Sequence, residues 1–184
     1  MAVRRRCEEL AAAAAGSANP GFSWTAIVCG HFFEAGLRRG YLFFDLDSQT
    51  ARILDSGNTR ASVSTLRCVA RAVVSVLERL SATRNRALFV HSFCPTQLEM
   101  LAALERATGR TWRREQLSSK ALLAESKAAQ SEGICGIEDK PTVDIVAVLR
   151  TVDADWAAKE GFASQLLGLQ DEKLDDAVAE VLKS

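Results

Sequence analysis

Two histidines, each near a cysteine, are the residues whose types and spacing could carry chemistry. Cys29 and His31 are two positions apart, and His91 lies beside Ser92 and close to Cys94. An imidazole next to a thiol or hydroxyl can act as its general base in nucleophilic catalysis. That mechanism also needs a group that orients the base, and neither histidine has an evident partner of that kind. A packed or solvated histidine is therefore the alternative at both positions, and we assign no catalytic residue.

The rest of the sequence lacks the usual signatures of metal, phosphate and proton-transfer sites. The five cysteines are an odd number without a C-x-x-C pair, which predicts no disulfide framework, zinc site or redox motif and points to a reducing compartment. With only two histidines, no metal site is predicted. These 184 residues contain neither G-x-G-x-x-G after a strand nor G-x-x-x-x-G-K-[ST], the glycine-rich turns that hold phosphates. The only tyrosine, Tyr41, has Asp45 four residues later, where a Tyr–Lys proton-donating pair would need lysine.

The best ligand-binding candidate is the end of the first apolar run. Residues 24–29 read as a buried strand that ends in a glycine turn and opens onto two aromatic residues. Open α/β sheets bind ligands at the carboxyl ends of their strands. Cys29 and His31 would share a face only if the strand continued through the glycine. The aromatic pair could form a wall for a planar ligand or belong to the hydrophobic core. The predicted pocket residues are Cys29, Gly30, His31, Phe32 and Phe33.

The elements that position this end of the chain form a crossover unit. One alanine-rich helix, 3–15, precedes the strand, and an apolar helical stripe predicts a helix over 65–80 that packs on a sheet. The stripe consists of Leu66, Val69, Ala70, Val73, Val74, Leu77 and Leu80. A second strand over 86–93 would then lie parallel to the first. Between them, 41–45 and 51–54 predict a small hairpin.

The remainder, 96–184, is predicted to be mainly helical. Thr96 and Glu99 match a capping box that starts a helix ending at Gly109. An edge strand over 111–115 follows, and then come helices over 120–130, 142–152 and 172–182, the last capped by Asp171, with a loop over 133–139. The fold class is α/β: a partial Rossmann-like parallel sheet with a mostly helical portion. We expect a single domain over 1–184, with 1–95 as sheet and crossover helix.

The charge distribution excludes some partners. The net charge is zero, so nothing attracts nucleic acid or an anionic membrane to the whole chain. Residues 1–114 nevertheless carry a net charge of +7 and residues 115–184 a net charge of −7. This asymmetry indicates either two faces of opposite charge, which could bind an anionic ligand or a partner chain, or an ordinary solvated surface. No stretch reaches the roughly 18 apolar residues of a membrane span, and Glu8 and Glu9 interrupt the only run that could imitate a signal peptide. We expect a cytoplasmic protein.

On these residues the chain resembles the carboxyl-terminal half of the NmrA-like and isoflavone-reductase-like proteins, atypical short-chain dehydrogenases, and in particular fungal aromatic-alcohol-reductase types. The resemblance is carried by the segments 24–33, 51–58, 88–93 and 161–163. It implies an NAD(P)-dependent reductase fold, with NADP or NAD as cofactor, a small aromatic substrate, and residues 30–33 lining the nicotinamide and substrate pocket.

The resemblance also implies what lies elsewhere. Members of this group place their glycine-rich dinucleotide turn near their start, and the isoflavone type uses a lysine shortly before the helix that here begins at Val3; both would lie upstream of Met1. We therefore expect a truncated, substrate-side half with little independent activity. The Trp24 strand would then have an open edge that invites a partner chain or self-association. The alternatives are a non-catalytic NmrA-like regulatory or binding module that pairs with a partner, and an incomplete gene model.

Overall fold

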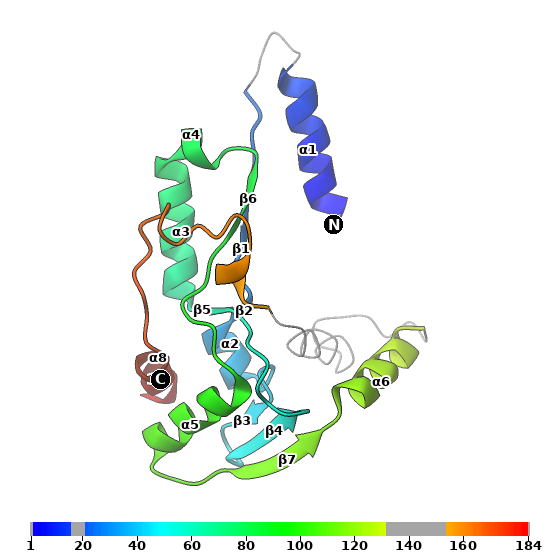
Figure 1. Ribbon diagram of the computed structural model, residues 1–184, viewed down its shortest axis with the longest axis vertical. Coiled ribbons are helices and arrows are strands. Elements are labelled where there is room, and N and C mark those ends of the chain that lie inside the picture. The colour runs from blue at the N-terminus through cyan, green and yellow to red at the C-terminus, as the bar shows by residue number, and fades with distance from the viewer. Residues whose placement is uncertain (1, 16–20, 132–153, 184) are drawn as a thin grey trace.

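The computed structural model describes residues 2–15, 21–131 and 154–183 (Figure 1). It is an α/β fold built on small sheets with helices around them, so the predicted class is confirmed. The loop and helix predicted over 133–139 and 142–152 lie outside the described residues.

The predicted crossover unit is present. Strand β1 (Thr25–Val28) follows helix α1 (Ala2–Ala15) and pairs in parallel with β6 (Arg86–Phe89), in the register Val28 to Phe89. Helices α3 (Leu66–Glu78) and α4 (Leu80–Thr83) connect the two strands. Parallel strands require such a crossover, because a tight turn can join only antiparallel ones.

The face that α3 buries differs from the prediction. Its buried residues are Cys68, Ala72 and Val76, and this face joins Leu88 and Val90 in a small core. Six of the seven members of the predicted stripe are exposed instead, and the exposed fraction of the five large ones runs from 44% for Val73 to 64% for Leu77. The helix is apolar on more than one side, so its periodicity predicted a helix correctly but selected the wrong face. The exposed members are Leu66, Ala70, Val73, Val74, Leu77 and Leu80.

A second sheet lies below the crossover unit. Strand β4 (Thr50–Leu54) pairs antiparallel with β3 (Phe44–Asp45), which confirms the hairpin, and parallel with β7 (Arg113–Leu117), which confirms the edge strand two residues later than predicted. Between the two sheets, β2 (His31–Phe32) pairs with β5 (Val63–Ser64).

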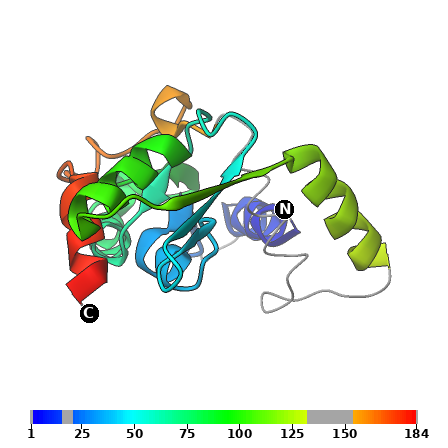
Figure 2. The ribbon, with the colours of Figure 1, turned by 90° about the horizontal axis from the view of Figure 1, so that it is seen from below.

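Two helices cover this second sheet beside a short one that was not predicted. Helix α5 (Gln97–Thr108) starts at the capping box: Thr96 Oγ1 accepts from the Glu99 amide at 3.1 Å, and Glu99 Oε2 accepts from the Thr96 amide at 2.8 Å. It ends at Gly109, whose φ is +64°. Helix α8 (Leu174–Lys183) lies beside α5 (Figure 2). The short helix α2 (Phe33–Arg38) and both longer helices share the main hydrophobic core.

Helix α8 begins later than the predicted 172–182. Glu172 lies ahead of the helix, where its carboxylate bonds Thr65 and Arg67. That bonding holds Glu172 against the first turn of α3, so the helix starts two residues further on than predicted.

The remaining described elements lie at the margins. Helix α6 (Ser119–Ser131) projects from the body at the end of β7 (Figures 1 and 2). The short 3-10 helix η2 (Trp156–Ala158) contacts β6, because the ring of Trp156 packs against that of Phe89. Within the described residues, none of the helices has the length and apolarity needed to cross a membrane.

Candidate functional site

The site is assembled at the carboxyl ends of β1 and β6. The Val90 amide donates to the Val28 carbonyl at 3.0 Å, so the parallel pairing continues beyond Phe89. The residues that follow the two strands, Gly30 and His91, therefore emerge at the same edge. This edge is where open α/β sheets bind their ligands.

Gly30 is required by its surroundings. Its φ is +68°, and a Cβ at this position would lie 2.1 Å from the carbonyl oxygen of Ser62 and 3.2 Å from Nε1 of Trp156. A side chain is excluded by both the backbone conformation and the space. Because Gly30 turns the chain, β1 ends at Val28, and the strand does not continue through to His31 as a shared Cys29–His31 face would need.

Cys29 and His31 occupy the two sides of this turn. The Cys29 thiol is half-buried, and burial raises its pKa, so it is a neutral thiol at pH 7. The Cys29 carbonyl accepts a hydrogen bond from Ser64 Oγ at 2.7 Å. The His31 amide donates to the Ser62 carbonyl at 3.4 Å. The backbone at this edge is thus fixed by the β5 segment.

The two aromatic residues have different roles. Phe33 is fully buried in the main core and meets Phe93 edge to face, with 5.1 Å between ring centroids. Phe32 is 45% exposed. Of the two interpretations, the core applies to Phe33, and only Phe32 presents a ring that a ligand could contact.

Four residues of the site were not predicted as a group with the glycine turn: Ser62, His91, Trp156 and Phe162. Ser62 Oγ lies 2.8 Å from His91 Nδ1 and accepts from the Trp156 amide at 2.9 Å. The rings of Trp156 and Phe89 are 5.3 Å apart, and those of His91 and Phe162 are 4.9 Å apart. The sequence carries no signal for this grouping, because tertiary contacts across as many as 94 positions create it.

The environment of His91 favours its neutral form. Burial lowers the pKa of its imidazole, and the negative charges of Asp155 and Asp171 only partly oppose this. The ring is therefore uncharged at pH 7 and can donate or accept a hydrogen bond without attracting a phosphate. One further polar atom stands out here: Trp156 Nε1 is buried and has no hydrogen-bond partner among the described residues.

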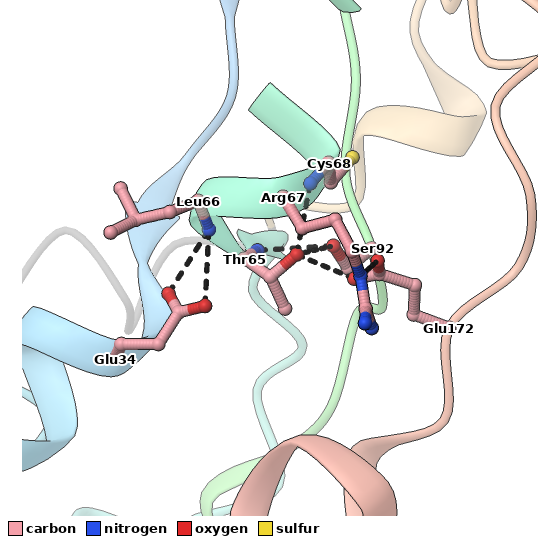
Figure 3. A network of polar contacts seen from close by, with 7 residues as sticks. All are labelled: Glu34, Thr65, Leu66, Arg67, Cys68, Ser92 and Glu172. Atoms are coloured by element: carbon pink, nitrogen blue, oxygen red, sulfur yellow. Dashed lines mark hydrogen bonds and ion pairs between the residues drawn. The ribbon is translucent and has the colours of Figure 1, made fainter. Parts of the chain in front are cut away.

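A polar network at the N-terminus of α3 connects this helix to the end of β6 (Figure 3). Thr65 Oγ1 accepts from the Cys68 amide at 3.0 Å and donates to Glu172 Oε2 at 2.6 Å. The Thr65 amide donates to Ser92 Oγ at 3.0 Å, which ties the residue after His91 to α3. Figure 3 shows Glu34 and Glu172 on opposite sides of the first turn of the helix.

Glu172 is charged within this network. Burial raises the pKa of its carboxyl, but hydrogen bonds from Thr65, Ser92 and Arg67 outweigh burial and leave the pKa lowered. Arg67 Nε lies 2.9 Å from Glu172 Oε1. A carboxylate near a helix N-terminus is also favoured by the helix dipole. The network therefore fixes the strand ends and the start of α3 relative to each other.

Comparison with known proteins identifies relatives of this chain. No protein-family model matches the chain. Oxidoreductase poxI of Penicillium oxalicum is 33% identical over 99% of the chain, which covers 58% of that protein, and oxidoreductase aprR of Aspergillus flavus is 30% identical over 90% of the chain, which covers 55% of that protein. The chain thus spans little more than half the length of these curated relatives.

Solved structures share the fold. Leucoanthocyanidin reductase from Vitis vinifera with NADPH has a TM-score of 0.71 at 15% identity, over 98% of this chain and 60% of that one. Isoflavone reductase has a TM-score of 0.66 at 17% identity, over 97% of this chain and 56% of that one. The predicted fold of the isoflavone-reductase-like proteins is thus confirmed. An Escherichia coli NADPH-dependent quinone oxidoreductase also matches, with a TM-score of 0.59 at 15% identity over 90% of this chain and 57% of that one.

Two of these structural neighbours are linked to NADPH: the quinone oxidoreductase is NADPH-dependent, and the leucoanthocyanidin reductase was solved with NADPH. In this chain, the described residues at the strand ends offer aromatic rings, a neutral imidazole and an unpaired indole N–H.

Proposed function

We propose that these 184 residues form the substrate side of an NAD(P)H-dependent reductase that acts on a small aromatic carbonyl compound. The observation that carries the proposal is the unpaired Nε1–H of Trp156, buried beside Gly30 at the carboxyl ends of β1 and β6. A buried donor without a partner costs about 1–3 kcal/mol. A ligand carbonyl or carboxamide oxygen that accepts this hydrogen would recover that cost.

The rings around Trp156 support an aromatic ligand. Phe32 is the exposed aromatic at this edge, and the Phe89–Trp156 and His91–Phe162 pairs extend the apolar surface. In the proposal, Gly30 allows the Ser62 carbonyl and Trp156 to pack against the strand end, His31 and Phe32 flank the ligand, and Cys29 lies at the strand end without a chemical role. No residue of the chain is assigned as catalytic.

The cofactor would be held mainly by another part of the protein. The described residues fit the nicotinamide end of NADPH, whereas the sequence of this chain contains no glycine-rich phosphate turn. We therefore propose that the chain alone has little activity. We also propose that the protein works in the cytoplasm. The four described cysteines form no disulfide, which is typical of proteins in a reducing environment.

Two surfaces support the proposal that a further unit packs against this chain. Among the described residues β1 pairs with β6 alone, which leaves its other edge open, and α3, whose buried face packs on the same strand pair, presents an exposed apolar face on another side. An open strand edge and an apolar helix face are normally covered. A dinucleotide-binding unit, a partner chain or a second copy would each cover them, and the reductase proposal favours the first.

The test compares the chain alone with a fusion to the part of the Penicillium oxalicum relative that the chain does not match. We expect NADPH to bind the fusion and an aryl aldehyde to be reduced, whereas the chain alone does neither. In the fusion, Trp156→Phe removes the N–H and should lower kcat/KM about 3- to 10-fold, which is one neutral hydrogen bond.

Trp24→Phe is the matched control, because Trp24 lies at the opposite end of β1, where its amide meets the side chain of Asn85. Equal kcat/KM for both variants would contradict the role of Trp156. A fusion that binds a protein partner but neither NADPH nor substrate would favour the regulatory alternative.

A further inference from the structure

Three side chains with metal-binding chemistry gather beside the site. A ring nitrogen of His91, the sulfur of Cys94 and a carboxylate oxygen of Asp155 all lie within 4.8 Å of one another, and each residue is partly buried. His91 and Cys94 follow β6, whereas Asp155 directly precedes η2. The group is assembled by the fold, which is why sequence spacing predicted no metal site.

We propose that His91, Cys94 and Asp155 bind a zinc ion. Imidazole nitrogen, thiolate sulfur and carboxylate oxygen are the three ligand types that zinc accepts in proteins, and a thiolate disfavours magnesium and calcium. One thiolate and one carboxylate also balance the two positive charges of the ion, so the occupied site is neutral. This proposal does not rest on the reductase assignment.

The geometry needs only a small adjustment. Ligands about 2.0–2.3 Å from zinc in a tetrahedral site lie roughly 3.3–3.8 Å from one another. The present separations are at most 4.8 Å, so inward movements of about 1 Å, within reach of side-chain rotation, complete three bonds. Among the described residues, three ligands leave a fourth position open, the pattern of open rather than structural zinc sites.

The neighbours hold two of the ligands in suitable orientations. Ser62 Oγ lies 2.8 Å from His91 Nδ1 and can accept its hydrogen, which leaves Nε2 to bind the metal, as the outer partners of metal-bound histidines do. Asp155 Oδ1 accepts from the Ala157 amide at 2.9 Å, which fixes the carboxylate at the start of η2.

The third ligand is supported through its backbone, at the border of a groove. Arg60 donates to the Cys94 carbonyl at 2.7 Å and is itself paired with Glu99. A groove of about 380 Å³, lined in part by Arg60, Cys94 and Pro95, opens beside the thiol and gives an ion a route in from solvent.

Cobalt and zinc titrations of the metal-free chain test the proposal. Co²⁺ should bind one to one and give the near-ultraviolet absorption of a sulfur–cobalt bond, and Zn²⁺ should displace it. Cys94→Ser should abolish that absorption and weaken zinc binding more than tenfold. Ser62→Ala, which removes only the partner of His91, should weaken zinc binding about 10- to 100-fold.

The matched control is Cys29→Ser, which leaves the three ligands in place and should bind zinc as the parent chain does. Circular dichroism of each variant shows whether it remains folded. The proposal is overturned if no sulfur–cobalt absorption develops, if it persists in folded Cys94→Ser, or if Cys29→Ser abolishes it.

Discussion

Replacing Gly30 with alanine tests the packing of the strand end most sharply, because the chain offers a matched control. Gly30 and Gly109 have nearly the same φ, +68° and +64°, but a Cβ on Gly30 would lie 2.1 Å from the Ser62 carbonyl oxygen, whereas a Cβ on Gly109 would meet nothing within 4 Å. Alanine in this left-handed conformation costs about 1–2 kcal/mol at either position. The difference between the two variants therefore isolates the contact with Ser62.

The size of that difference follows from the 2.1 Å approach. Real Cβ contacts are essentially never below 3.0 Å, so backbone must move by about 1 Å, and overpacking of this kind costs roughly 1–3 kcal/mol. Gly30→Ala should thus destabilise the chain by about 2–5 kcal/mol, and Gly109→Ala by about 1–2 kcal/mol.

Urea unfolding of both variants and the parent chain, followed by tryptophan fluorescence and circular dichroism, measures these values. Equal m-values are required for the comparison, because m reports the surface exposed on unfolding. If Gly30→Ala proves no less stable than Gly109→Ala, Gly30 does not pack on the β5 segment as described, and the site has a different shape.

Three further predictions concern the network at the start of α3 and its cysteine. Thr65→Val removes the helix cap and the hydrogen bond to Glu172, and it should lower the free energy of unfolding in urea by about 2–4 kcal/mol. Thr65→Ser keeps the hydroxyl and should lower it much less. Equal losses in the two variants would count against the network. Because the pKa of Glu172 is lowered in the fold, its contribution to stability is present above its ordinary pKa of 4.5 and is lost as pH falls through the folded value. Glu172→Gln should therefore reduce the loss of unfolding free energy that the parent chain shows at acid pH. An unchanged dependence on acid pH would refute this. Cys68, 3% exposed and with its pKa raised by burial, should react with iodoacetamide far more slowly than Cys7, as mass spectrometry of proteolytic peptides from the alkylated chain can measure; equal rates would mean that α3 opens readily.

Local patterns predicted the elements well where one residue type decides the outcome. The capping box at Thr96 and the stop at Gly109 are local hydrogen bonding and backbone conformation, and both are confirmed. The parallel β1–β6 pair followed from the helix between two apolar runs. The buried face of α3 could not be chosen in this way, because the helix is apolar on more than one side and only its contacts with Leu88 and Val90 settle which side is buried.

The candidate site was predicted only in part, for a related reason. An apolar run that ends in Gly30 indicates a strand end, and the structure has its turn there. The short helix that begins at Phe33 was missed, because six residues with a central glycine have little helical pattern. Ser62 meets both His91 and Trp156 through tertiary contacts alone, so a single sequence gives no means of finding this grouping.

Calorimetric titration of NADPH tests the central claim most directly, namely that these residues supply the substrate side of a reductase and not its dinucleotide site. The chain alone should show no binding heat at micromolar NADPH, whereas the fusion with the unmatched part of the Penicillium oxalicum relative should bind with a micromolar Kd. Micromolar binding by the chain alone, together with turnover of an aryl aldehyde, would contradict the account.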